Sequence, residues 1–333
     1  MKIPHVKILI TLAIAAMISI LAAGASALYY TKVKRDVCKS DANLKKDGHN
    51  VIPDIKPDKP LDLSLLKHDE VVDAPPITPR VEPVIRNLEL SARSAVIMDA
   101  ESGCILYAKN ADLRLLPAST AKVMTVIVAL ENRDLDSLIK ASPNVKRVET
   151  TRVGLTPGAE YKLRDLVLAA LINSANDAAI TIAEGISGSE EAFAELMTEK
   201  AKKLGMFNTE FTTASGLPQK PKDTQYTTAY DLAVMMRYVT RNAFILETMS
   251  QRFGVIQGSD GKKIYLRTHN RTVRRNSDVV WGKTGYTRRA KKTFVGCDAS
   301  LKPKIVFAMM KSDNLWVDVK KLKCAGLAAC KNR

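Results

Sequence analysis

Two pairs of short apolar runs with the character of β-strands lie far apart in this chain of 333 residues. Residues 94–98 and 104–107 flank a turn, and residues 293–297 and 305–309 flank a second turn at 301–303. Each pair predicts a hairpin. The stretch between the two pairs has mostly helical spacing, so we expect one sheet that is assembled from distant segments and carries a helical insertion.

The segment between the two hairpins predicts several helices. Apolar residues recur at helical spacing after Ser119 and again through residues 163–186, where residues 173–176 break the pattern. Residues 190–204 repeat the pattern and stop at Gly205, and glycine commonly ends helices. A further helix is expected after a capping-box spacing of Thr228 and Asp231, and a last one at residues 315–329.

The first thirty residues differ from the rest of the chain. Residues 8–30 hold 23 side chains without a charge. Such a run is long enough for a membrane-spanning helix, and Tyr29 and Tyr30 suit an aromatic anchor at the membrane surface. The Ala-Ser-Ala sequence at 25–27 is instead typical of the cleavage site of an export signal. We favour a retained anchor, and on either interpretation the remaining chain is expected outside the cytoplasm, in the cell envelope or periplasm.

A proline-rich segment follows this apolar run. Residues 31–86 are polar, contain seven prolines and show no sustained periodicity. This composition predicts a partly extended linker. The expected organisation is therefore a signal peptide or N-terminal anchor at 1–30, a linker at 31–86 and one folded domain at 87–330.

The positive charge of the chain is concentrated near its C-terminus. The net charge is +16, and residues 251–333 hold 20 lysines and arginines against 5 aspartates and glutamates. A basic face attracts polyanions such as acidic wall polymers or an anionic membrane surface. Nucleic acid is disfavoured as a partner because the sequence has no aromatic-rich or recognition-helix motif and follows an export segment.

Five cysteines give an odd number without a CxxC spacing. They therefore indicate neither a disulfide framework nor a zinc site, and the sequence indicates no other metal or cofactor. A bridge between Cys324 and Cys330 stays open. The favoured interpretation is that most of these cysteines are small buried apolar residues.

The first candidate for chemistry is Ser119, which precedes Lys122 by three residues. At the start of a helix the two side chains share a face, so the amine reaches the hydroxyl. A lysine with a pKa of about 10.4 is a poor base at neutral pH. Burial or a second nearby cation lowers the pKa and makes the neutral amine available to activate the serine as a nucleophile. Taken alone, the pattern is weak, because a capping serine and a surface lysine also produce it.

Two further short motifs follow in the chain. Ser174 and Asn176 lie at the break between two helices, and Lys283, Thr284 and Gly285 lie at an expected edge strand. Each motif alone is explained by an ordinary turn. Together, in this order with Ser119 and Lys122, they form the combination typical of penicillin-binding proteins and class A β-lactamases.

Residues 92–318 resemble the serine D-alanyl-D-alanine carboxypeptidases, the low-molecular-mass penicillin-binding protein family. The resemblance extends beyond the three motifs to 94–99, Gly103, 117–125, 174–179, 205–206, 216–217, 228–229 and 283–287. It implies an α+β fold of the β-lactamase/transpeptidase type, with a central antiparallel sheet flanked by helices and a helical lobe. The implied partners are a peptidoglycan peptide as substrate and β-lactams as inhibitors.

The resemblance also implies roles for individual residues. Ser119 would attack the peptide bond between two D-alanines, Lys122 would be the base, and Ser174 would relay a proton. Asn176 would hold the substrate amide, and Lys283 and Thr284, which Gly285 follows, would bind the terminal carboxylate. The backbone N–H groups of Ser119 and Tyr286 would form the oxyanion hole.

Some positions differ from the family's pattern. Lys291 and Lys292 stand where the family usually has a glycine after Ala290, and Trp281 and Gln225 are also unusual. These positions border the expected substrate groove. They leave peptide preference open more than the acyl chemistry.

The residues agree less well with other hydrolase classes. A Ser-His-Asp hydrolase is disfavoured because three of the four histidines lie outside the expected domain, and His269 fits a structural role. A β-lactamase is disfavoured because no Glu-x-x-x-Asn sequence stands at a plausible loop position. A D,D-endopeptidase that cuts peptide cross-links, or a non-catalytic protein that binds the cell wall through the basic face, stays open.

Overall fold

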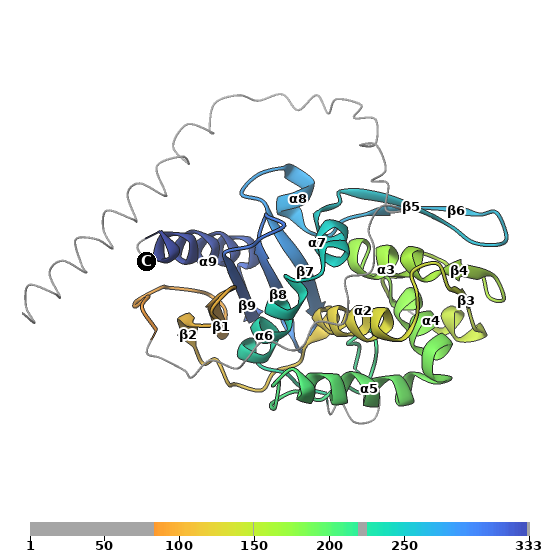
Figure 1. The fold of residues 1–333 in the computed structure, drawn as a ribbon, viewed down its shortest axis with the longest axis horizontal. Coiled ribbons are helices and arrows are strands. Elements are labelled where there is room, and N and C mark those ends of the chain that lie inside the picture. The colour runs from red at the N-terminus through yellow and green to blue at the C-terminus, as the bar shows by residue number, and fades with distance from the viewer. Residues whose placement is uncertain (1–82, 149, 219–224, 332–333) are drawn as a thin grey trace, which may run out of the picture. The chain divides into compact units, whose positions relative to one another are not determined.

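The computed structural model describes residues 83–148, 150–218 and 225–331 (Figure 1). In chain order the strands are β1 (Ser94–Asp99), β2 (Ile105–Lys109), β3 (Leu138–Lys140), β4 (Glu160–Lys162), β5 (Phe253–Gln257), β6 (Lys263–Arg267), β7 (Val280–Thr287), β8 (Lys291–Asp298) and β9 (Ile305–Ser312). The α-helices are α2 (Ala121–Asn132), α3 (Leu163–Ile172), α4 (Asn176–Ser187), α5 (Glu190–Lys203), α6 (Ala229–Val239), α7 (Ala243–Ser250), α8 (Arg271–Arg275) and α9 (Leu315–Cys330). Short 3₁₀ turns are η3 (Ala118–Thr120) and η4 (Pro143–Arg147).

A five-stranded sheet joins the two ends of the folded part. Its order is β2-β1-β9-β8-β7, and every neighbouring pair is antiparallel. Both predicted hairpins are confirmed, and β1 pairs with β9 across more than 200 residues of sequence. The predicted α+β class, with one sheet built from distant segments around a helical insertion, is confirmed. β7 lies at an edge of the sheet, as expected for the strand that carries Lys283.

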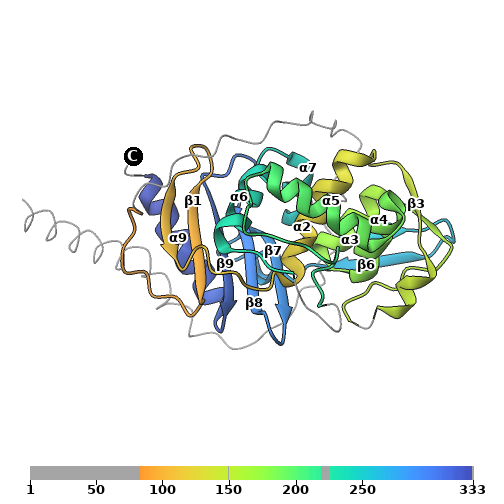
Figure 2. The same ribbon diagram turned by 90° about the horizontal axis from the view of Figure 1, so that it is seen from below.

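Separate apolar clusters cover the two faces of this sheet. On one face α9 packs through Val319 and Leu322 against Ile97, Phe294 and Phe307. On the other face the core continues into α2, α3, α4, α5, α6 and α7. Figure 2 shows α9 on one side of the strands and the helical lobe on the other. The sheet therefore forms the central layer, and the lobe packs beside the end that carries β7.

The predicted helix boundaries inside the lobe are confirmed. α3 and α4 are separate, and the break falls at residues 173–175. α5 ends just before Gly205, which has a φ of 85°. The capping box at α6 is only half formed. Thr228 accepts a hydrogen bond from the backbone N–H of Asp231, but the Asp231 carboxylate accepts instead from the preceding loop at Asn208 and Thr209.

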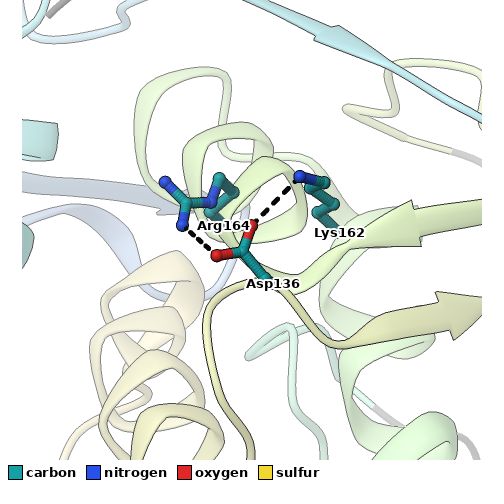
Figure 3. Close-up of polar contacts among 3 residues, drawn as sticks. All are labelled: Asp136, Lys162 and Arg164. Carbon is teal, nitrogen blue, oxygen red and sulfur yellow. Dashed lines mark hydrogen bonds and ion pairs between the residues drawn. The ribbon is translucent and has the colours of Figure 1, made fainter. Parts of the chain in front are cut away.

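Two small two-stranded sheets and two short helices were not predicted. β3 pairs with β4 and β5 pairs with β6, both antiparallel, and α7 and α8 lie before and after the β5–β6 hairpin. A carboxylate ties the loop before β3 to β4 and α3. Asp136 accepts hydrogen bonds from Lys162 Nζ at 3.0 Å and Arg164 Nη2 at 2.7 Å (Figure 3). These two partners lower the pKa of Asp136 below its ordinary value.

The four cysteines of the described residues are thiols. Cys297 is buried in the core, whereas Cys324 and Cys330 both lie on α9. Six residues of helix separate their Cα atoms by about 9 Å along the axis, beyond the 7 Å or so that a disulfide spans. The bridge that the sequence left open is therefore absent.

The predicted signal peptide or N-terminal anchor at 1–30, most of the linker and Cys38 lie outside the described residues. Within 83–148, 150–218 and 225–331, no helix is both long and apolar enough to cross a membrane. At the N-terminal end of this part, the backbone N–H of Ile85 donates to Leu106 O at 2.8 Å.

Candidate active site

Ser119 lies in a tight turn at the start of α2. Ala118 before it has a φ of 48°, and the hydroxyl of Thr120 after it donates to Pro117 O at 2.7 Å. A positive φ is uncommon for alanine and costs strain that is often found at functional sites. The turn leaves Ser119 half-buried while Ala118 and Thr120 are buried. The hydroxyl of Ser119 is thus presented at the end of a buried helix.

Lys122 is fully buried one helical turn later. Its Nζ is 3.0 Å from Ser119 Oγ, 2.6 Å from Asn176 Oδ1 and 2.8 Å from Ser215 O. Burial and the nearby positive charge of Lys283 hold the pKa of Lys122 well below its ordinary value. The sequence-based expectation that the two side chains meet, with a lysine poised to be neutral, agrees with this geometry.

The break between α3 and α4 places two polar side chains in the same buried region. Ser174 has a φ of 59°, and Asn176 begins α4. Asn176 accepts from Lys122 with Oδ1 and donates with Nδ2 to Thr150 O at 2.7 Å. Because both ends of this amide have a partner, the orientation of Asn176 toward Lys122 is fixed.

Asp177, next to Asn176, anchors the loop that faces the break. Its buried carboxylate accepts the backbone N–H groups of Val153, Gly154 and Leu155 at 2.8–3.2 Å. A carboxylate satisfied by three backbone donors holds a loop firmly without a counter-ion. The sequence analysis gave Asp177 no role.

Lys283 on β7 is the second buried lysine. Its Nζ donates to Ser174 Oγ and to Thr284 O, both at 2.8 Å. Burial lowers its pKa to about 7. Lys283 therefore links the sheet to the helical lobe directly at the α3–α4 break, and its charge acts on Lys122.

Gly285 is the point at which β7 approaches the nucleophile. A Cβ atom at this position would lie 3.0 Å from Ser119 N, 3.1 Å from Ala118 Cβ and 2.3 Å from Thr293 Oγ1. Only glycine allows the strand to pass this close to the start of α2. Figure 1 shows β7 beside that end of α2. Thr284 is half-buried and Tyr286 is 61% exposed, so the strand continues outward from this contact.

The carbonyl of Ser215 is a site group that the sequence analysis missed. The loop that carries it is held by Glu190, which accepts from Ala214 N at 2.9 Å, and by Thr125, which donates to Ala214 O at 2.6 Å. Gly216 has a φ of 74°, and a Cβ there would lie 1.9 Å from Ala118 O. The resemblance already included Gly216, which is the signal that could have pointed to this loop.

The structure brings the three motifs into one site. Lys122 contacts both Ser119 and Asn176, Ser174 contacts Lys283, and Gly285 abuts Ser119. The partner of the serine hydroxyl is a lysine, which is inconsistent with a Ser-His-Asp relay. In the described part of the chain, no group of three or more His, Cys, Asp or Glu side chains is arranged to hold a metal ion.

The structural role that the sequence analysis favoured for His269 over catalysis stays a prediction. The backbone N–H of His269 donates to Ile172 O at 3.3 Å, close to the α3–α4 break. Partial burial and the positive charges of Lys283 and Arg274 lower the pKa of its imidazole, so the ring is disfavoured as a cation.

Comparison with protein families agrees with this arrangement. A family model described as D-alanyl-D-alanine carboxypeptidase matches residues 80–314. A D-alanyl-D-alanine carboxypeptidase of Bacillus subtilis is 34% identical over 205 residues, which are 60% of this chain and 52% of the relative. One of Mycobacterium tuberculosis is 34% identical over 219 residues, 66% of this chain and 74% of the relative. A D-alanyl-D-alanine endopeptidase of Escherichia coli is 31% identical, over 61% of this chain and 65% of the relative.

Solved structures show the same fold. The D-alanyl-D-alanine carboxypeptidase structure from Mycobacterium tuberculosis superposes with a TM-score of 0.66 at 30% identity, over 77% of this chain and 96% of that chain. A penicillin-binding protein of Listeria monocytogenes, determined in its ampicillin-bound form, gives a TM-score of 0.63 at 28% identity, over 73% of this chain and 100% of that chain.

Proposed function

The chain belongs to the D-alanyl-D-alanine carboxypeptidase family, and we propose that it is a serine carboxypeptidase that removes the terminal D-alanine from peptidoglycan stem pentapeptides. The observation that carries this proposal is the contact of a fully buried lysine amine with the hydroxyl of Ser119. The two other acceptors of this amine, Asn176 Oδ1 and Ser215 O, are protein atoms that do not react. The amine therefore has two fixed acceptors and is aimed at one reactive group.

Acylation would begin at the Ser119 hydroxyl. Its oxygen forms a bond to the carbonyl carbon of the penultimate D-alanine while its proton passes to the neutral amine of Lys122. The carbon–nitrogen bond to the terminal D-alanine then breaks, and the leaving nitrogen takes up a proton through Ser174. Ser174 suits this relay because its oxygen accepts from Lys283, which leaves its own proton to be donated.

Deacylation would use the same groups in reverse. A water attacks the ester carbon and gives a proton to Lys122, and the Ser119 oxygen recovers a proton as the ester bond breaks. The shortened peptide leaves with a new carboxylate.

Binding of the substrate would use the edge strand. Lys283 and Thr284 would hold the terminal carboxylate, and Asn176 the substrate amide. Donors for the developing oxyanion would be the backbone N–H groups of Ser119 and Tyr286, on the two elements that meet at Gly285.

The proposed reaction requires delivery of the domain to the cell wall. We propose that residues 1–30 direct export and anchor the chain at the membrane, and that residues 31–86 separate the catalytic domain, residues 87–330, from that anchor. The chain spans about half the length of the Bacillus subtilis relative. The proposed activity therefore rests on the residues of this chain's own site.

Reaction with benzylpenicillin tests the proposal. β-Lactams mimic the terminal D-alanine pair, so we expect an intact-mass increase that maps to Ser119, and release of D-alanine from a pentapeptide. Ser119→Ala should abolish both while the protein stays folded. A folded protein that forms no adduct and releases no D-alanine would refute the proposal. Biological activity that survives Ser119→Ala would instead favour the non-catalytic wall-binding alternative.

A D,D-endopeptidase is the second candidate, and the similarity to the Escherichia coli endopeptidase favours it. It would use the same catalytic residues on cross-linked peptides. Comparing kcat/KM for a monomeric pentapeptide with that for a cross-linked dimer separates the two, since the carboxypeptidase should prefer the monomer.

A further inference from the structure

The turn that joins β7 to β8 carries a group of cations close to Ser119. Arg288, Arg289, Lys291 and Lys292 are all exposed there. Lys292 Nζ donates to Asp313 O at 2.7 Å. Within the described residues, the charged ends of Arg288 and Lys291 have no hydrogen bond or ion pair and remain available for a ligand.

The strand register places this turn on the opposite side of the nucleophile from the carboxylate cradle. Gly285 abuts Ser119 N, and Lys283 lies two residues before it. Thr287 lies two residues after Gly285 and pairs with Lys291. At about 3.4 Å per residue, the pair is about 7 Å along the strand from the contact with Ser119.

The same register places Lys291 on the face of the sheet that looks toward α2. Alternate residues of a strand share a face, and directly paired residues of neighbouring strands share it too. Thr293, two residues after Lys291, faces that side, because its hydroxyl donates to Pro117 O at 3.2 Å. The register therefore assigns the Lys291 position to the Ser119 side of the sheet, at the end of β8 where the backbone is left-handed.

The backbone at Lys291 supports a role for its side chain. Lys291 has a φ of 56°, a conformation that glycine adopts without strain and other residues adopt at a cost. A turn with no use for a side chain here would be relaxed by glycine. The lysine retains a charge at a position where the backbone disfavours it.

We infer that Lys291, with Arg288 beside it in the same exposed turn, binds a carboxylate on the donor peptide, at the residue that precedes the D-alanine pair. This inference rests on the proposed function. If the terminal carboxylate lies at Lys283 and the reacting carbonyl at Ser119, the peptide upstream must leave toward Thr287. One more residue and its side chain cover about 7–10 Å in an extended peptide, which reaches the turn. The substrate class is therefore a stem peptide with an acidic third residue.

A pair of isosteric substrates tests this inference. We compare acetylated tripeptides that carry either glutamate or glutamine before D-Ala-D-Ala. The native protein should prefer the glutamate peptide about five- to tenfold in kcat/KM, mainly through KM. The preference should shrink as salt rises, since exposed charges are screened. Arg288→Gln/Lys291→Gln should bring the ratio close to one.

Lys302→Gln/Lys304→Gln is the matched control, because it also removes two positive charges and both lysines are exposed in the turn between β8 and β9. It changes the net charge without touching the β7–β8 turn, and should keep the native ratio. Equal rates for both peptides in the native protein, or a ratio that survives in the double variant, would overturn the inference. A double variant that loses only its binding to phosphatidylglycerol vesicles would make the turn a membrane contact and also overturn it.

Failure of the proposed function has a different signature. In that case neither peptide is hydrolysed and benzylpenicillin leaves Ser119 unmodified. Hydrolysis of both peptides at the same rate would reject the acidic preference and leave the carboxypeptidase proposal intact.

Discussion

Replacement of Lys122 by methionine is the most direct test of the catalytic arrangement. Methionine fills a similar volume but supplies neither a base nor a donor to Asn176 Oδ1 and Ser215 O. A positioned general base contributes about 10²–10⁴ in rate, or roughly 3–5 kcal/mol of barrier. We therefore expect the rate of acylation of Lys122→Met by benzylpenicillin to fall by about 10²–10⁴.

Stability should change less than the rate. Two buried carbonyl acceptors lose their donor, at about 1–3 kcal/mol each, but the protein no longer buries an amine that is costly to desolvate. Near-UV circular dichroism and urea unfolding establish that the variant is folded. A folded Lys122→Met that acylates within tenfold of the native rate would refute the role of Lys122 as the base.

Two further measurements test whether Lys122 must be neutral to act as the base. Arginine stays protonated at any accessible pH, so Lys122→Arg should be as inactive as the methionine variant. In the native protein the amine acts only when neutral, and its pKa lies well below the ordinary value because of burial and Lys283. The acylation rate should therefore rise with pH and level off well below pH 10.5. A rate that keeps rising to pH 10.5 would contradict this.

Three other predictions concern neighbouring groups. Lys283 has a pKa of about 7, so between about pH 7 and 10 the unfolded chain binds one proton more than the folded chain. The free energy of unfolding should therefore rise with pH across that window, and urea titrations should show a smaller rise for Lys283→Met. Gly285→Ala places a Cβ 2.3 Å from Thr293 Oγ1 and should slow acylation at least tenfold, with the penicillin reaction as the assay. Asp177→Asn leaves three backbone donors without a carboxylate and should lower the free energy of unfolding by about 3 kcal/mol in urea.

The sheet and the long helices were predictable because their signal is local. β1, β2, β8 and β9 are runs of five to eight residues with buried side chains, and α9 has a regular apolar spacing. β3 and β4 have three residues each, too few for a periodic pattern. The β5–β6 hairpin did carry a usable signal, since Ile264 and Leu266 alternate with exposed residues.

The sequence predicted those groups of the site that are side chains, but not those that are backbone atoms. The motif residues meet because two motifs lie at the ends of helices, Ser119 before α2 and Ser174 after α3, and the third, with Lys283, lies on the edge strand beside them. The carbonyl of Ser215 could not be read from the sequence, because every residue has a carbonyl and only the fold selects one. The role of Asp177 was hidden for a related reason, since its partners are backbone N–H groups of another loop.

The two buried lysines are best understood as one electrostatic unit. A neutral Lys122 keeps two N–H groups for its two fixed acceptors, Asn176 Oδ1 and Ser215 O, and offers its lone pair to Ser119, so loss of the proton leaves no buried acceptor without a partner. Lys283 favours this state through its own charge, but with a pKa of about 7 that charge is only partly present at neutral pH. A substrate carboxylate beside Lys283 would stabilise the ammonium there, but its own negative charge would offset the effect of that ammonium on Lys122. Burial, the larger cause of the lowered Lys122 pKa, does not depend on that carboxylate, so an amide substrate without it should lose affinity more than acylation rate.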